Sequence, residues 1–289
     1  MTLIAERAPA KVNLTLEILG RRADGFHELS SLVAFADVCD AVTIDTEGPR
    51  GLVVSGPMAA HLAGPNILDK AVALLCRATS KLAIGTIYLE KRLPVAAGLG
   101  GGSANAAALL RAISRANPDA GRDVDWHAVA ARLGADVPVC LAGEASWMRG
   151  IGDVLSPLRY ALPRLDVVLV NPMAAVPADK TAQVFRKLGA RPGGEAARHD
   201  EPEFADRARL VAYLRRCGND LAEAAATIVP EMRDVLAALA NQAEADLVAV
   251  SGAGPTCFAI LPDAARAQRA AEDLRLLNPH WWIETAVIA

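Results

Sequence analysis

Four glycines within five positions form the segment of this sequence with the clearest chemical meaning. Gly98, Gly100, Gly101 and Gly102 are followed directly by Ser103 and by a stretch rich in alanine. Backbone without side chains can bend closely around an anion and direct several N–H groups at it. A helix that begins there adds its free N–H groups and the positive end of its dipole. The Ser103 hydroxyl suits a phosphate oxygen or a water on a metal ion, so the segment predicts a polyphosphate site.

Two better-known phosphate motifs do not match this segment. It lacks the Gly-Lys-Ser/Thr ending of a P-loop, and no acidic residue follows at the spacing that binds a ribose in dinucleotide-binding folds. Asp119 lies at nearly that distance, but it follows Pro118 in a turn. A tight turn without a ligand is the plainer alternative, and it leaves the clustering of four glycines before a helix unexplained.

The elements around the glycine segment follow the order strand, loop, helix. Residues 84–89 have the pattern of a strand, and Ser103–Ala116 runs without Pro or Gly as a helix. A further helix is predicted from Asp125, a good N-cap, to Gly134, a good C-cap, with Asp136 directly after it.

The remaining pattern indicates two α and β halves, which we place at residues 1–158 and 159–289. In the first, apolar residues alternate with Lys11, Asn13 and Thr15, as in a half-buried strand with these three on one face. In the second, residues 187–206 lack periodicity and are predicted to be a surface loop. Further elements are predicted as helices at 66–78, 210–216, 219–228, 231–241 and 263–277 and as strands at 41–45, 52–54, 165–170, 247–251, 256–261 and 282–287.

Composition excludes several classes of protein. The chain has 289 residues, of which 53% are hydrophobic and 22% charged, and its net charge of −3 gives no net attraction to nucleic acid. The start becomes charged before an apolar stretch develops, so we expect neither export nor a membrane span. The five cysteines are widely spaced, as in reduced cytoplasmic proteins. The five histidines show no close metal-ligand spacing, and no Ser-His-Asp hydrolase elbow is present.

The glycine segment also carries a resemblance to a known family. Residues 98–107 resemble the ATP loop of the GHMP kinases, the superfamily of galactose, homoserine, mevalonate and phosphomevalonate kinases. Four other segments agree with this family: Pro9–Leu14, Gly20–Leu29, Gly134–Pro138 and Ser251–Gly254. The resemblance spans the whole chain. It implies an α+β (α/β two-layer) fold with a ribosomal-protein-S5-like N-terminal domain, a ferredoxin-like α+β C-terminal domain and an active site in the cleft between them.

The resemblance implies an ATP-dependent transfer of a phosphoryl group to an alcohol. In the family, Asp136 would orient and deprotonate the acceptor hydroxyl, and Lys11 would offset the developing charge. Asn66 resembles a position that contacts the adenine end of ATP, although Gly-Pro-Asn is also ordinary helix-start chemistry. Magnesium would arrive with ATP. The residues expected to bind the nucleotide are Pro94, Ala96, Ala97, Gly98, Leu99, Gly100, Gly101, Gly102, Ser103, Ala104 and Asn66.

The acceptor is predicted from residues outside the glycine loop. Phe26 and His27 follow a turn, and in the resembling kinases this pair stacks on cytosine and hydrogen-bonds its edge. The family usually has Tyr where this chain has Phe26. We therefore expect a polyol that carries cytidine diphosphate, bound by Asn13, Phe26, His27, Asp136, Gly252 and, in a segment that matches only loosely, Phe185.

Two alternatives stay open at this point. One is a GHMP kinase of homoserine or mevalonate type, and the other is a non-catalytic nucleotide-binding regulator, which would have lost Lys11 or Asp136. Pro255 departs from the family pattern because it removes a backbone N–H near the site. A monomer and a homodimer are equally compatible with the sequence.

Overall fold

The computed structural model of the protein describes residues 3–62, 64–189, 204 and 206–289, which form two compact units. The first unit comprises Met1–Lys11, Cys39–Val95 and Gly100–Glu144, and the second comprises Val12–Val38, Ala96–Leu99 and Ala145–Ala289. The units are interleaved along the chain, because the first strand, the long third strand and the glycine loop each contribute residues to both. The predicted division after residue 158 follows sequence order and stays a prediction.

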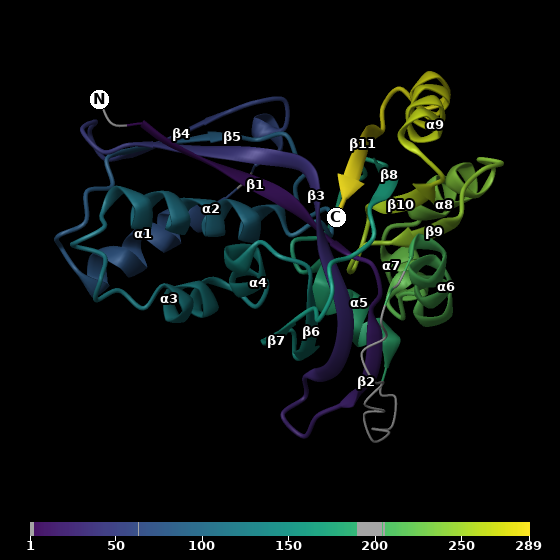
Figure 1. The fold of residues 1–289 in the computed structure, drawn as a ribbon, viewed down its shortest axis with the longest axis horizontal. Coiled ribbons are helices and arrows are strands. Elements are labelled where there is room, and N and C mark those ends of the chain that lie inside the picture. Colours follow the sequence, from purple (N-terminus) through teal and green to yellow (C-terminus); the bar gives the residue numbers. More distant parts are fainter. Residues whose placement is uncertain (1–2, 63, 190–203, 205) are drawn as a thin grey trace. The chain divides into compact units, whose positions relative to one another are not determined.

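The first unit is a layer of strands with helices on one side, as Figure 1 shows for α1 to α4. β4 runs parallel to β5, and β5 pairs antiparallel with the second half of β3, where Ala41 lies opposite Glu90. α2 is buried almost throughout its middle, because its small side chains from Ala104 to Ala108 allow close packing. The elements of this unit are β1 (Leu3–Asn13), the second half of β3 (His27–Asp45), β4 (Gly51–Ser55), the 3₁₀ helix Ala59–His61, α1 (Ile67–Ala78), β5 (Thr86–Glu90), α2 (Gly101–Ala116), α3 (Trp126–Leu133) and α4 (Val137–Ala142).

The second unit is built on an antiparallel sheet in which β11, β8, β10 and β9 lie in that order. Alternate residues of these strands, such as Val168, Val170 and Ala259, form one core with the buried residues of α5, α7, α8 and α9. These helices therefore cover one face of the sheet. The elements are the first half of β3, β2 (Glu17–Arg21), β6 (Ser146–Gly150), β7 (Val154–Pro157), β8 (Leu165–Asn171), α5 (Lys180–Leu188), α6 (Arg207–Cys217), α7 (Ala222–Ile228), α8 (Met232–Ala240), β9 (Leu247–Val250), β10 (Cys257–Leu261), α9 (Ala264–Leu277) and β11 (Trp282–Ile288).

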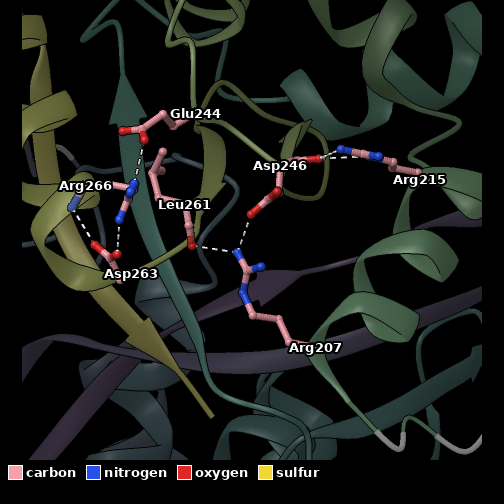
Figure 2. A network of polar contacts seen from close by, with 7 residues as sticks. All are labelled: Arg207, Arg215, Glu244, Asp246, Leu261, Asp263 and Arg266. Atoms are coloured by element: carbon pink, nitrogen blue, oxygen red, sulfur yellow. Dashed lines mark hydrogen bonds and ion pairs between the residues drawn. The ribbon is translucent and has the colours of Figure 1, made fainter.

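A network of arginines and carboxylates ties the ends of several elements of the second unit together (Figure 2). Arg207 of α6 donates to the Asp246 carboxylate and to the Leu261 carbonyl at the end of β10, both at 2.6 Å. Arg215, which lies about two turns further along α6, donates to the Asp246 carbonyl. Arg266 of α9 bonds Glu244 at 2.6 Å. Most of these groups are partly exposed, so each contact contributes little alone, and their joint effect is to fix α6 and α9 against the turn before β9.

Most sequence predictions of elements are confirmed. The α+β class, the helix between Asp125 and Gly134 with both caps, and the strands at β8, β10 and β11 are all present. The helix after the glycines begins at Gly101 rather than at Ser103. None of the helices in the described residues combines the length and apolar character that a bilayer span requires.

Other predictions were wrong in their limits. The strand predicted from Val12 onward ends at Asn13, because Leu14 and Thr15 both donate to the Leu32 carbonyl in a bulge. No strand was predicted between residues 146 and 157, but these residues form the hairpin β6–β7, whose turn contains Gly150 and Gly152 at positive φ. α5 was not predicted. The loop predicted at 187–206 falls mostly outside the described residues.

Asn117 is a buried residue that ties the end of α2 to the chain just before β5, the strand that leads to the glycine loop. Its amide accepts from Ala83 N at 2.7 Å and donates to the carbonyls of Ala83 and Ile113 at 2.9 and 2.8 Å. Strand and helix are therefore held together at the end opposite the glycines.

Replacing Asn117 by alanine removes three hydrogen bonds, of which the one to the Ile113 carbonyl is buried and the two to Ala83 are partly buried, so we expect the free energy of unfolding to fall by about 3 kcal/mol. Asn278→Ala is the matched control, because Asn278 also ends a helix but donates a single bond, of 3.3 Å, to Leu274. It should cost less than about 1 kcal/mol. Denaturant unfolding measures both, and equal costs would contradict the role given to Asn117.

Candidate active site

Lys11 and Asp136, which the sequence predicts as a pair, are in contact. Lys11 lies near the end of β1 and Asp136 is the residue before α4, and Lys11 Nζ lies 3.1 Å from Asp136 Oδ2. The lysine side chain is 5% exposed and the aspartate side chain is 36% exposed. Asp136 makes no side-chain hydrogen bond to the helix that it precedes. Its carboxylate is therefore left at the surface, held by a buried cation rather than used as a cap.

The second half of the glycine loop is packed against the same lysine. Gly100 has φ +61° and precedes α2, and a Cβ built on it would lie 3.1 Å from Lys11 Cβ and 3.2 Å from Lys11 Cε. Only glycine fits this combination of left-handed backbone and close contact. Gly101, Gly102 and Ser103 form the first turn of α2, where backbone N–H groups lack partners within the helix. The predicted anion site therefore starts beside the Lys11 stem.

A second ion pair, in which both side chains are buried, lies at the start of α2. Lys91 Nζ is 2.6 Å from Asp40 Oδ2, and Asp40 Oδ1 accepts from the backbone N–H groups of Arg92 and Leu93 at 2.7 and 2.8 Å. Burial lowers the pKa of Lys91, and the Asp40 carboxylate opposes this shift. A Cβ on Gly101 would lie 3.3 Å from Lys91 Nζ. Asp40 thus fixes the chain that enters the loop, and Lys91 places a cation beside the helix start.

The first half of the loop is held by three consecutive carbonyls, all within the second unit. Ala96 O accepts from Lys180 Nζ at 2.9 Å, Ala97 O accepts from Thr256 N at 3.0 Å, and Gly98 O accepts from Ser251 Oγ at 2.8 Å. A trans peptide points its N–H away from its carbonyl. The N–H groups of residues 97, 98 and 99 therefore point away from these donors, as an anion-binding loop requires.

The turn at Gly252 and Gly254 lies directly against this half of the loop. A Cβ on Gly98 would lie 2.5 Å from Ser251 O and 2.8 Å from Gly254 O, so no side chain fits there. Gly252 and Gly254 both have positive φ, and the Gly254–Pro255 peptide is cis. The backbone of this turn therefore approaches the glycine loop closely at Gly98.

Asn13 is buried beside the same turn. Its backbone N donates to Ser251 Oγ at 3.1 Å, and its Nδ2 donates to Ser31 Oγ at 2.7 Å. A Cβ on Gly252 would lie 3.2 Å from Asn13 Oδ1. The Asn13 side chain is thus oriented by Ser31, and its role as a substrate ligand stays a prediction.

The predicted cytosine-reading residues lie in the second unit. His27 begins β3, and its ring centroid lies 5.2 Å from that of Phe185 on α5, with the ring planes 30° apart. Nε2 of His27 is buried and has no hydrogen-bond partner within the described residues. Phe26, in the turn before β3, is 58% exposed. An imidazole that packs on one aromatic ring, carries an unused nitrogen and follows an exposed phenylalanine in the chain suits a flat, polar ligand.

Asn66 starts a helix, which is the structural alternative that the sequence analysis gave for this residue. It is the N-cap of α1, and its Oδ1 accepts from Leu68 N at 3.0 Å. Contact with adenine stays a prediction for this residue. Within the described part of the chain, no group of His, Cys, Asp and Glu side chains is arranged to hold a metal ion.

Sequence reasoning missed the residues that fasten the loop. Ser251 was noted only as part of the glycine turn, and Thr256 only as the start of a strand. Lys180 stands in the loosely matching segment 176–185, and a lone lysine between two loops carries no signal in the sequence. Their carbonyl acceptors lie more than 80 residues away along the chain, so only the fold brings them together.

Comparison with known proteins places this site in a family. The model of the GHMP kinases N-terminal domain matches residues 66–144, and the model of the GHMP kinases C-terminal domain matches residues 195–279. The chain is 46% identical to a 4-diphosphocytidyl-2-C-methyl-D-erythritol kinase of Azorhizobium caulinodans, with 100% of both chains covered. It is also 46% identical to the protein of that name from Methylobacterium radiotolerans, with 98% of both covered.

Solved structures agree with the sequence relatives. A crystal structure of 4-(cytidine 5'-diphospho)-2C-methyl-D-erythritol kinase matches with a TM-score of 0.77 and 33% identity over 99% of both chains. A homoserine kinase from Cytophaga hutchinsonii matches with a TM-score of 0.67 at 18% identity over 100% of this chain and 95% of the other, a likeness of fold alone.

These findings define the class as an ATP-dependent GHMP kinase. The predicted α+β fold and the kinase activity are confirmed at this level. Within the class, the chain belongs to the 4-diphosphocytidyl-2-C-methyl-D-erythritol kinase family, because identity above 40% extends over the full length of several members.

The two neighbouring glycines of the loop should respond differently to an added methyl group. Gly100→Ala forces a left-handed alanine against Lys11, so we expect a loss of about 2 kcal/mol in the free energy of unfolding. Gly102→Ala meets nothing nearer than Ile67 Cγ2 at 3.9 Å and adds a better helix former, so stability should rise by about 0.5 kcal/mol. Denaturant unfolding of both variants tests this, and a Gly100→Ala protein as stable as the parent would contradict the packing described.

Proposed function

We propose that this chain transfers the γ-phosphoryl group of ATP to the 2-hydroxyl of 4-diphosphocytidyl-2-C-methyl-D-erythritol. The products are the 2-phosphate and ADP, and the reaction is a step of the non-mevalonate route to isoprenoid precursors. The observation that carries the proposal is the Lys11–Asp136 contact of 3.1 Å beside Gly100 at the start of α2. Full-length relatives that bear the name of this kinase support the choice of substrate. Because both substrates are water-soluble small molecules, we place the reaction in the cytoplasm.

The chemical step needs a proton acceptor and a nearby cation. The hydroxyl oxygen of the acceptor forms a bond to the γ-phosphorus while the bond from that phosphorus to the β,γ-bridging oxygen breaks. The hydroxyl proton passes to the Asp136 carboxylate, and ADP leaves with the electron pair of the broken bond. Lys11 is buried against Asp136, so it lies ready to offset negative charge that develops on the acceptor oxygen.

The nucleotide would lie with its phosphates at the glycine loop. The first turn of α2 supplies N–H groups and a hydroxyl from Ser103, and Lys91 lies within 3.3 Å of the position that a Gly101 side chain would take. Both features favour several negative charges in one place. Magnesium would arrive with the nucleotide and neutralise part of the phosphate charge. The carboxylate of Asp136 and the hydroxyl of Ser103 are groups of the kind that a hydrated magnesium ion accepts.

The cytidine group would be read by Phe26, His27 and Phe185. The exposed Phe26 ring offers stacking area, and the unpartnered Nε2 of His27 offers a hydrogen bond to the edge of the base. The Phe185 ring packs against the imidazole and supports it. A kinase whose acceptor substrate carries no nucleobase would gain no affinity from these three side chains.

The choice of acceptor can be tested directly by measuring phosphoryl transfer from ATP to three alcohols. We expect kcat/KM for the cytidine substrate to exceed that for homoserine or mevalonate by at least about a thousandfold, because the latter leave His27 unpaired and the aromatic contacts unused. A strong preference for either acceptor without cytidine would overturn the assignment. His27→Ala should raise KM for the cytidine substrate and leave KM for ATP unchanged.

Asp136→Asn keeps the shape of the side chain but removes the proton acceptor. We expect kcat to fall by about 10²- to 10⁴-fold, with nearly unchanged affinity for ATP. Asp125→Asn is the matched control: Asp125 caps α3 by accepting from Ala128 N at 2.9 Å, and asparagine caps equally well. It should retain full activity. An Asp136→Asn enzyme that turns over as fast as the parent would remove Asp136 from the mechanism and would favour a different base.

A further inference from the structure

We propose that Lys180 is a positioning residue for nucleotide binding, whose buried ammonium holds the first half of the glycine loop in the conformation that receives phosphate. The inference rests on the proposed function in placing ATP at this loop. It concerns a residue that lies outside both ranges matched by the family models, 66–144 and 195–279.

The contacts of Lys180 join two loops. Its Nζ donates to Ala96 O at 2.9 Å, in the segment that leads into the glycines, and to Gly254 O, in the turn that packs against Gly98. Lys180 is only 4% exposed. Both acceptors are backbone carbonyls, so the ammonium acts on the path of the chain rather than on another charge.

The position of Lys180 is unfavourable for a charged side chain for two separate reasons. An ammonium buried against neutral carbonyls loses its hydration without a carboxylate to offset the loss, and burial lowers the pKa of Lys180 to about 8. Lys180 is also the first residue of α5, where the helix dipole disfavours a positive charge. A lysine chosen only to start a helix would point into water. The geometry therefore indicates that this position serves the loops.

The backbone that Lys180 holds is strained. Ala96 has φ +53°, a left-handed conformation that a residue with a side chain adopts at a cost of about 1 kcal/mol or more. The carbonyl of that same residue is the one that accepts from Lys180. The Ala96 carbonyl and the Ala97 N–H belong to the same peptide plane and point in opposite directions. If this plane rotated by half a turn, the Ala97 N–H would point away from the proposed phosphate site. Lys180 prevents this by fixing the carbonyl of the peptide.

Lys180→Met tests the inference, because methionine keeps most of the apolar stem and loses both donors. We expect the Kd of a non-hydrolysable ATP analogue, measured by calorimetry, and KM for ATP to rise at least about tenfold. KM for the alcohol substrate should change less than about threefold. Lys180→Gln keeps an uncharged NH2 donor group on a shorter side chain, so it should give an intermediate ATP affinity. It also tests the inference if the methionine variant folds poorly.

Two further variants separate loop positioning from general damage. Lys187→Met changes an exposed lysine of the same helix and should bind ATP as the parent does. Ala96→Gly, combined with Lys180→Met, should recover at least about threefold in ATP affinity, because glycine adopts positive φ without strain. Unchanged ATP affinity in Lys180→Met, an equal rise in both KM values, or no recovery with Ala96→Gly would each overturn the role of Lys180.

A last variant tests the location of the nucleotide itself. Gly102→Asp places a carboxylate in the first turn of α2, where space is open and an acidic residue suits the helix start, but it repels a polyphosphate. It should weaken ATP binding far more than Gly102→Ala. If Gly102→Asp binds ATP normally, the nucleotide site of the proposed function is wrong. If it loses ATP binding while Lys180→Met keeps it, only the role of Lys180 fails.

Discussion

The close approach of two turns at Gly98 is the constraint on which the loop depends. The carbonyls of Ser251 and Gly254 lie where any side chain at Gly98 would have to stand, so the two stretches of backbone meet directly. Polar backbone groups buried in such a contact need partners, and the carbonyls at 96–98 find theirs in Lys180, Thr256 and Ser251. With the carbonyls engaged, the N–H groups of the same peptides point away from these donors. The packing of the two turns therefore also sets the direction of the loop N–H groups.

Three lysines show how burial is used differently near this loop. Lys11 is buried against a carboxylate that remains partly exposed. Lys91 is buried against Asp40, which also orders the chain entering the loop. Lys180 has backbone carbonyls as acceptors. Lysine is thus used here in a partly exposed ion pair, in a buried ion pair and as a tie between two loops, according to the groups that replace its hydrating water.

Sequence patterns predicted elements well where local signals agreed. The helix Trp126–Leu133 has both caps in sequence, and its limits are confirmed. The hairpin at 146–157 was not predicted, because its glycines and prolines are as typical of a linker as of a hairpin turn. The strand predicted near Val12 was too long, because Leu14 and Thr15 both donate to the Leu32 carbonyl of β3 and this bulge ends the regular pairing. The Lys11–Asp136 contact followed from family resemblance, since residues 125 positions apart have no local reason to meet.

By itself, the sequence determined the class of chemistry, because a cluster of glycines before a helix favours an anion and because the family motifs of a kinase are local strings of residues. It also determined the aromatic and imidazole groups suited to a base. Tertiary structure decided how the loop is held and which charges lie beside it. Lys180, Ser251 and Thr256 act through backbone carbonyls that have no side-chain identity, so no pattern of residue types records these contacts. Only the folded path of the chain brings such donors to such acceptors.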